Sequence, residues 1–215
     1  MTIHHLTHNK IRLALHEVRP GSGRPLLLLH GLGEQSPNSV PDVAAAWPGP
    51  VVALDFTGHG ASTVPAGGGY SAEILLGDAD VALAHLGEAT VLGRGLGGYI
   101  ALLLAGARAT QVRGAVICDG PGLWGGPSGP TSTSFVTLED ARNSPDPYAL
   151  LELSRDLRPR DYAALFARLA VENSGMEEPI TVASVVRPPW LEAVLDEMGI
   201  TVGDAAQALA TYCAD

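Results

Sequence analysis

Lysine, cysteine and long apolar runs are scarce in this sequence of 215 residues. Lys10 is the only lysine among 13 basic residues, and the formal net charge is −10. Such a chain repels phosphate backbones, so we expect no nucleic-acid partner. Two cysteines, Cys118 and Cys213, are too few for a disulfide framework. No apolar run approaches the ~20 residues of a membrane span, and residues 1–10 lack a signal-peptide pattern, so we expect a soluble, cytoplasmic protein without a membrane partner.

The composition and the strand patterns predict one α/β domain over residues 1–215. Hydrophobic residues make up 46% of the chain and charged residues 17%, which is typical of a globular protein with one well-buried core. Residues 10–18 alternate between apolar and polar side chains, and with residues 2–7 they predict an antiparallel hairpin with Asn9 in its turn. Apolar runs that end in glycine-rich turns then predict parallel strands: residues 25–33, 50–62, 89–98 and 113–122.

Helical patterns at residues 71–87 and 98–107 separate these runs, as in an α/β protein with right-handed crossovers. After Pro121 the chain is rich in glycine, proline and serine, and two further helical patterns follow. We expect residues 121 to about 178 to be a small, lid-like helical insertion rather than a second domain. A strand, a helix, a short strand and a last helix are predicted to complete the fold: residues 179–186, 188–199, 200–203 and 204–214.

Two motifs overlap at residues 93–98, whose sequence is GRGLGG. It matches the G-x-G-x-x-G turn that binds a dinucleotide, and Asp119 ends the next strand where a ribose-binding acid would stand. The same residues match the G-x-S-x-G nucleophile elbow, with Gly95 in place of the serine. The dinucleotide hypothesis is weakened by position, because two glycine-ended strands and a hairpin precede the motif, whereas the fingerprint normally follows the first strand of its unit.

Three consecutive strand ends resemble those of the α/β-hydrolase superfamily. HGLG at residues 30–33 is similar to that family's oxyanion loop, DFTGHGAS at 55–62 to its second-strand signature, and GRGLGG at 93–98 to its elbow. The resemblance implies an α/β-hydrolase fold, with a mainly parallel sheet, an N-terminal antiparallel hairpin, helices on both faces and a small helical lid. Its elbow is a strained turn, which glycine tolerates better than any other residue.

The resemblance also implies a Ser-His-acid triad, and this sequence departs from it at all three positions. The serine position holds Gly95. The family's histidine follows the last strand, but all seven histidines lie at or before His85, and Asp204 stands near the expected place. The family's acid follows the strand at 179–186, where Arg187 comes next. We therefore predict a degenerate site without ordinary serine-hydrolase activity.

Parts of a binding site remain. The backbone N–H groups of Leu32 and Leu96 match the family's oxyanion-hole donors, and these do not depend on side chains. Arg94 either borders the pocket or pairs with an acid. The candidate ligand-binding residues are His30, Gly31, Leu32, Arg94, Gly95 and Leu96.

Three functions stay open. The first is a non-catalytic binder of a small acyl or carbonyl compound, or of a protein partner. The second is a hydrolase with relocated catalytic residues, for which His30, His59 and Asp119 are the candidates, although a structural role is the simpler interpretation of each. The third is a dinucleotide-binding protein. We expect no cofactor and no metal, because His4, His5 and His8 have no acid or cysteine at ligand spacing. The sequence does not predict an oligomeric state.

Overall fold

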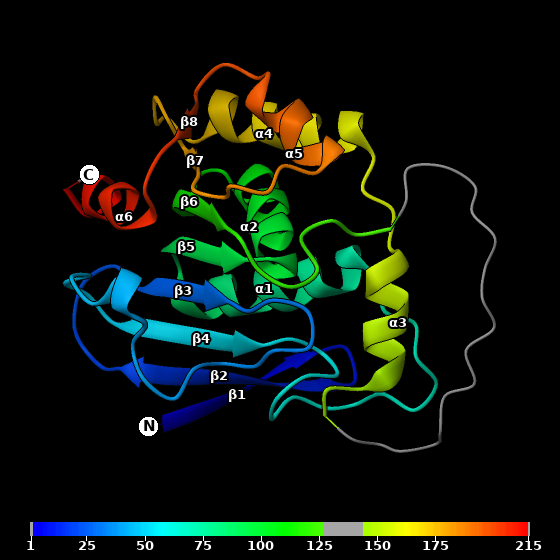
Figure 1. The fold of residues 1–215 in the computed structure, drawn as a ribbon. Helices are drawn as coiled ribbons and strands as arrows, with labels where there is room; N and C mark the ends of the chain where they lie inside the picture. The colour runs from blue at the N-terminus through cyan, green and yellow to red at the C-terminus, as the bar shows by residue number, and fades with distance from the viewer. Residues whose placement is uncertain (1, 127–143, 215) are drawn as a thin grey trace.

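The computed structural model describes residues 2–126 and 144–214, which form an eight-stranded sheet in the order β1-β2-β4-β3-β5-β6-β7-β8 (Figure 1). The predicted hairpin is confirmed: β1 (Thr2–His8) pairs antiparallel with β2 (Ile11–Arg19), and Asn9 lies in the turn with a φ of 56°. β2 then pairs antiparallel with β4 (Val51–Asp55), which joins the hairpin to the rest of the sheet.

The other strand pairs are parallel, as predicted. β3 (Leu26–Leu29) lies between β4 and β5 (Ala89–Arg94), and β6 (Val112–Cys118), β7 (Ile180–Val182) and β8 (Ile200–Val202) continue the sheet. Their registers pair Leu29 with Gly93 and Arg94 with Cys118. The loops that follow β3, β5 and β6 therefore begin at the same edge of the sheet.

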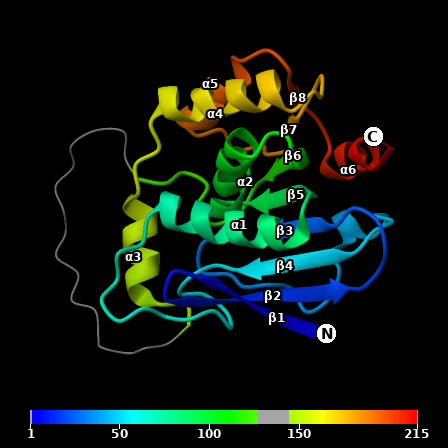
Figure 2. The ribbon, with the colours of Figure 1, turned by 180° about the vertical axis from the view of Figure 1, so that it is seen from behind.

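Helices cover both faces, but unequally. Five helices share one core cluster with the first face: α1 (Ala72–Leu86), α2 (Leu96–Ala107), α4 (Arg160–Asn173), α5 (Pro189–Leu195) and, through Ala149 and Leu153, α3 (Pro147–Arg155). Figure 2 shows α1, α2 and α4 on this side. The opposite face packs against two short elements, the 3₁₀ helix η1 (Asp42–Ala44) and α6 (Ala205–Ala214) (Figure 1). In the described residues, much of this second face is covered by loop rather than by helix.

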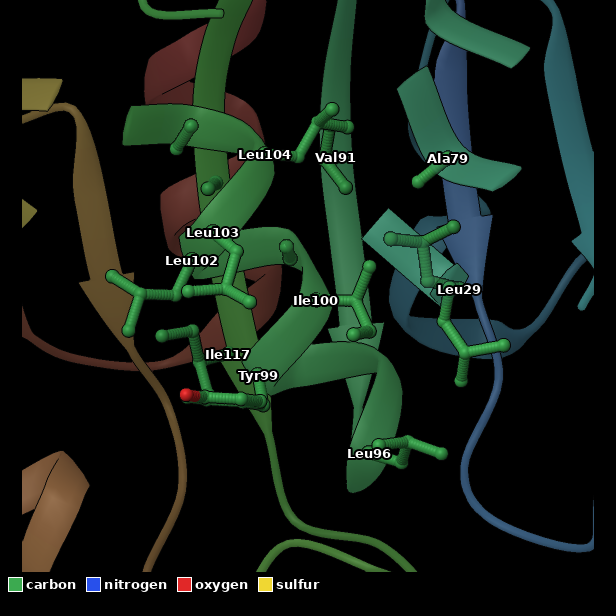
Figure 3. Close-up of a cluster of buried hydrophobic side chains, with 14 of the residues drawn as sticks. Leu29, Ala79, Val91, Leu96, Tyr99, Ile100, Leu102, Leu103, Leu104 and Ile117 are labelled. Atoms are coloured by element: carbon green, nitrogen blue, oxygen red, sulfur yellow. The ribbon is translucent and has the colours of Figure 1, made fainter. Parts of the chain in front are cut away.

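The core that holds the elbow in place lies between α2 and the sheet (Figure 3). Every residue of α2 from Leu96 to Ala105 is buried, because the helix has the sheet on one side and α1 and α4 on the others. Ile100 faces Leu29 and Val91 of the sheet. A buried leucine or isoleucine side chain contributes about 1.5–3 kcal/mol, so this packing fixes the start of α2 firmly against β3 and β5.

The predicted insertion contains the two expected helices, α3 (Pro147–Arg155) and α4. α3 lies beyond the carboxyl ends of the strands, whereas α4 packs beside α2 as part of the helical layer (Figures 1 and 2). Residues 127–143 of the insertion lie outside the described residues, so the lid itself stays a prediction. Within the described residues, no helix combines the length and the hydrophobicity that a membrane span requires.

Candidate functional site

The elbow is a tight turn between β5 and α2. Gly95 has a φ of 58° and a ψ of −122°, and its N–H donates to the carbonyl oxygen of Cys118 at 3.0 Å. The N–H of Gly97 donates to the carbonyl oxygen of His30 at 3.1 Å. The loops after β3, β5 and β6 thus meet at Gly95, as the order of the three sequence motifs predicts.

The two predicted oxyanion-hole donors point at one oxygen atom, and that atom belongs to the chain itself. The N–H groups of Leu32 and Leu96 donate to the carbonyl oxygen of Pro121 at 3.0 and 2.9 Å. Two backbone N–H groups that donate to the same oxygen atom are the arrangement that stabilises an oxyanion. Here a backbone carbonyl oxygen takes that position.

The segment that carries Pro121 lies directly against the elbow. A β-carbon at position 95 would overlap the Pro121 carbonyl oxygen and would lie 2.6 Å from the carbonyl carbon of Gly120. A β-carbon at position 122 would lie 2.6 Å from the β-carbon of Leu32. The close packing of residues 120–122 therefore depends on glycine at the position where the resemblance implies serine.

The places implied for the histidine and the acid hold Asp204 and Arg187. Asp204, after β8, accepts hydrogen bonds from the N–H groups of Ala206 and Gln207 at 2.9 and 3.1 Å, which caps the start of α6. Arg187, after β7, is exposed. No histidine follows His85 in the sequence.

His30 is buried with both ring nitrogens engaged by backbone. Nδ1 donates to the carbonyl oxygen of Gly31 at 2.8 Å, and Nε2 accepts from the N–H of Phe56 at 3.1 Å. Burial, and then the neighbouring His59, lower the pKa of His30 to about 4. The ring is a neutral link between two loops, with no nitrogen left for proton transfer.

His59 is held in the same way. Its Nδ1 donates to the carbonyl oxygen of Thr57 at 3.1 Å, and its Nε2 accepts from the N–H of Gly33 at 3.3 Å. Burial lowers its pKa. His59 shapes the turn after β4 and ties it to the loop after β3.

Asp119 accepts hydrogen bonds from the loop after β7. The donors are the hydroxyl of Ser184 at 2.5 Å and the N–H groups of Val185 and Val186 at 2.8 and 3.0 Å. Partial burial opposes the charged form, but these bonds keep the pKa of Asp119 below its usual value. The carboxylate fastens one loop to another.

Arg94 pairs with an acid. Its guanidinium donates to both carboxylate oxygens of Glu34, at 2.8 and 2.9 Å, and Glu34 also accepts from the N–H of Gly31 at 3.0 Å. Glu34, which follows HGLG directly, was not among the residues predicted from the sequence. The pair connects the loop after β3 to the end of β5.

The start of α2 offers little to a dinucleotide. A pyrophosphate at this motif binds to free backbone N–H groups of the first helical turn. The N–H groups of Gly95, Leu96 and Gly97 donate instead to carbonyl oxygens of the neighbouring loops. Asp119, the proposed ribose-binding acid, is engaged with the loop after β7.

The residues that could hold a metal are not gathered. Across residues 2–126 and 144–214, no group of three or more histidine, cysteine, aspartate or glutamate side chains could bind an ion. His8 bonds to Asp78 at 2.7 Å, and the ring of His4 lies 5.6 Å from that of His85. His8 and His4 thus contact a carboxylate and a ring, respectively, rather than one another.

Gly120 and Pro121, like Glu34, are site residues that the sequence did not predict. The sequence Asp-Gly-Pro-Gly at 119–122 indicates a turn, and nothing in it indicates that the turn folds back on the elbow. Gly95 was the one signal in the sequence that could have indicated this contact, because a glycine at the serine position leaves room for a neighbouring backbone.

The model of the alpha/beta hydrolase family matches residues 26–212. The chain belongs to the alpha/beta hydrolase family. Among solved structures, it is similar to a hypothetical protein of Pseudomonas aeruginosa PAO1, with 18% identity over 100% of this chain and 99% of that one and a TM-score of 0.68. A membrane phospholipase A, described as a bacterial virulence factor, is 16% identical over 98% of this chain and 85% of its own, with a TM-score of 0.57. At these identities the likeness is one of fold.

A probable hydrolytic enzyme of Pseudomonas aeruginosa PAO1 is 29% identical over 54% of this chain, with a TM-score of 0.47. The match spans 40% of that enzyme's length. A comparison with curated proteins found no match.

Proposed function

We propose that this member of the alpha/beta hydrolase family is not a hydrolase, and that it binds a small acyl or carbonyl compound, or a protein partner, without cleaving it. The observation that carries this proposal is the Pro121 carbonyl oxygen, which accepts hydrogen bonds from the N–H groups of both Leu32 and Leu96. Catalysis of acyl transfer needs these donors for the developing oxyanion and a nucleophile beside them. Here the donors have a partner, and Gly95 has no side chain.

The same contact bears on what could bind. The Pro121 oxygen stands where the carbonyl oxygen of an acyl ligand would stand, so such a ligand would bind at the elbow only by displacing residues 120–122. A ligand or partner that binds elsewhere on the protein faces no such cost. The elbow geometry therefore supports a non-catalytic role, in which the Leu32 and Leu96 N–H groups bind residues 120–122 of the same chain rather than a substrate.

The relocated-hydrolase hypothesis has less support. A general base must reach the proton it removes with a free ring nitrogen or carboxylate oxygen. Both nitrogens of His30 and of His59 bond to backbone groups, and Asp119 bonds to the loop after β7. The ring nitrogens of His30 and His59 bond to backbone groups rather than to a serine or cysteine. The Ser184 hydroxyl beside Asp119 also bonds to the carbonyl oxygen of Val186 at 2.6 Å, as part of the loop after β7.

The test is reaction with a fluorophosphonate probe and turnover of p-nitrophenyl acetate and butyrate, with an active alpha/beta hydrolase as the positive control. We expect neither labelling nor turnover above a protein-matched background, for the wild type and for Gly95→Ser. Saturable turnover by the wild type that His30→Ala or Asp119→Ala abolishes, with the variant still folded by circular dichroism, would overturn the proposal. Mass spectrometry of small molecules that co-purify with the protein tests its binding part.

A further inference from the structure

The sparsely covered face of the sheet carries a cavity of about 530 Å³. Its floor is formed by side chains from four adjacent strands, Leu28 of β3, Ala53 of β4, Leu92 of β5 and Cys118 of β6. Its wall is the connection from β3 to β4, which runs back over this face (Figure 1) and lines the cavity between residues 34 and 43. Small-molecule sites typically measure about 300–1,000 Å³.

This groove adjoins the elbow at His30 and Arg94, but Pro121 and its donors Leu32 and Leu96 are not among its lining residues. The elbow donors face Pro121 at the carboxyl edge of the sheet, whereas Leu28, Ala53 and Leu92 belong to the core cluster on the η1 and α6 side. α6 contributes no lining residue. η1 contributes Val43 to the wall. The groove therefore lies over the part of this face that α6 leaves uncovered, and a ligand there would leave residues 120–122 in place.

The charge of the lining limits what the groove accepts. Glu34 and Arg94 are its only acidic and basic residues among those described, and they neutralise each other through two hydrogen bonds. His30 is neutral at neutral pH because burial lowers its pKa to about 4. Cys118 is a neutral thiol, since burial raises its pKa to about 11. A charged ligand would lose hydration here and find no unpaired counter-ion.

We propose that this groove binds an uncharged, mainly apolar molecule, of the class of a medium-chain alkyl alcohol or ester. The alkyl chain lies over Leu28, Ala53 and Leu92, and the polar end faces the mouth near Glu34 and Arg94. This inference names a ligand class for the proposed binding role and rests on it. It does not depend on the absence of ester hydrolysis, which is measured separately.

The first experiment measures binding by fluorescence, with N-phenyl-1-naphthylamine as a neutral apolar probe and decan-1-ol and decanoate as competitors. We expect saturable binding of one probe per chain, displacement by decanol, and displacement by decanoate that is weaker by about tenfold, the order expected for an unpaired charge. No saturable binding, or equal competition by decanoate, would overturn the proposal. Probe binding that falls as the protein concentration rises would do the same, because a second copy would then occupy the groove.

The location is tested by filling the groove. Cys118→Phe places a ring where the thiol lines the floor, and Val43→Trp does so from the wall. Each should weaken probe binding by about tenfold or more, since the added ring occupies space on the floor or wall that the probe would contact. Cys213→Phe is the matched control, because Cys213 is exposed on α6 and lines no part of the groove. Unchanged binding in either folded variant would place the probe elsewhere.

The charge argument is tested by a gain of binding. Glu34→Gln leaves Arg94 without its carboxylate partner at the mouth, so decanoate should compete about tenfold better than with the wild type, while decanol changes little. This variant reports on the groove even where a filling variant fails to fold. Unaltered competition by decanoate would show that the Glu34–Arg94 pair does not set the preference. Ester turnover is measured in parallel, so the two proposals fail separately. Absence of ligand binding would overturn the groove proposal alone, and ester turnover would overturn the non-catalytic proposal alone.

Discussion

The carbonyl oxygen of Pro121 occupies space that a β-carbon on Gly95 would need. The two residues are 26 positions apart in the chain and follow adjacent parallel strands, β5 and β6. Glycine at position 95 and the hydrogen bonds from Leu32 and Leu96 to Pro121 are thus linked physically, because the second requires the first. A side chain at position 95 and the present course of residues 120–122 exclude each other.

Gly95→Ala should destabilise the protein more than an equally strained substitution in open space. Gly87, at the end of α1, has a φ of 84°, and a β-carbon there would meet nothing within 4 Å, so Gly87→Ala should cost only the strain of a positive φ, about 1–2 kcal/mol. Gly95→Ala adds the displacement of Pro121, and overpacking brings the total to about 2–5 kcal/mol. Urea unfolding of both variants measures the difference, and equal costs would mean that residues 120–122 yield freely.

Asp119→Ala should lower stability and leave ester turnover at background. It removes the acceptor for Ser184, Val185 and Val186, and the loss is about 1–3 kcal/mol because water can replace part of these bonds. Asp119→Asn keeps one carbonyl acceptor and should lose less. Thermal unfolding ranks the three proteins. An Asp119→Ala variant as stable as the wild type would show that the carboxylate does not fasten the loop after β7.

The sequence predicted most of the sheet because its signals there are local. Apolar runs ending in glycine-rich turns indicated the strands that became β3, β4, β5 and β6, and alternation indicated the β1–β2 hairpin. The family motifs indicated that the loops after β3 and β5 meet, and the Gly97 to His30 hydrogen bond confirms it.

The contents of the site were harder to predict because they depend on contacts between distant residues. No local rule pairs Arg94 with Glu34, 60 positions away, or brings Pro121 to the N–H groups of Leu32 and Leu96. The groove on the second face escaped prediction for the same reason. Its floor takes one side chain from each of four strands that are distant in the sequence. It is open because the connection between β3 and β4 contains only the short helix η1.

NAD and NADP should not bind. The first N–H groups of α2 donate to Cys118, Pro121 and His30 carbonyl oxygens, so a pyrophosphate would have to replace three hydrogen bonds that are already made. Titration calorimetry with either dinucleotide should give no saturable heat. Micromolar binding that Asp119→Ala weakens would restore the dinucleotide hypothesis.

The buried histidines should make the protein sensitive to mild acid. In the unfolded chain His30 takes up a proton near its ordinary pKa of 6.5, whereas in the folded protein burial and His59 lower the pKa to about 4. Between these values the unfolded state binds more protons, so stability falls as the pH falls. Burial lowers the pKa of His59 as well, which acts in the same direction, whereas burial raises the pKa of Asp78, which acts in the opposite one.

Comparison with His30→Gln isolates the contribution of His30. Glutamine can donate to the Gly31 carbonyl and accept from the Phe56 N–H but takes up no proton, so the variant should lose less stability on acidification. The difference between the two proteins should change by up to about 1.4 kcal/mol per pH unit from pH 6.5 down towards 4 and should be constant above 6.5. Urea unfolding at several pH values measures it. If His30→Gln kept the wild-type slope, His30 would be taking up its proton in the folded protein, and its ring would then be available for chemistry after all.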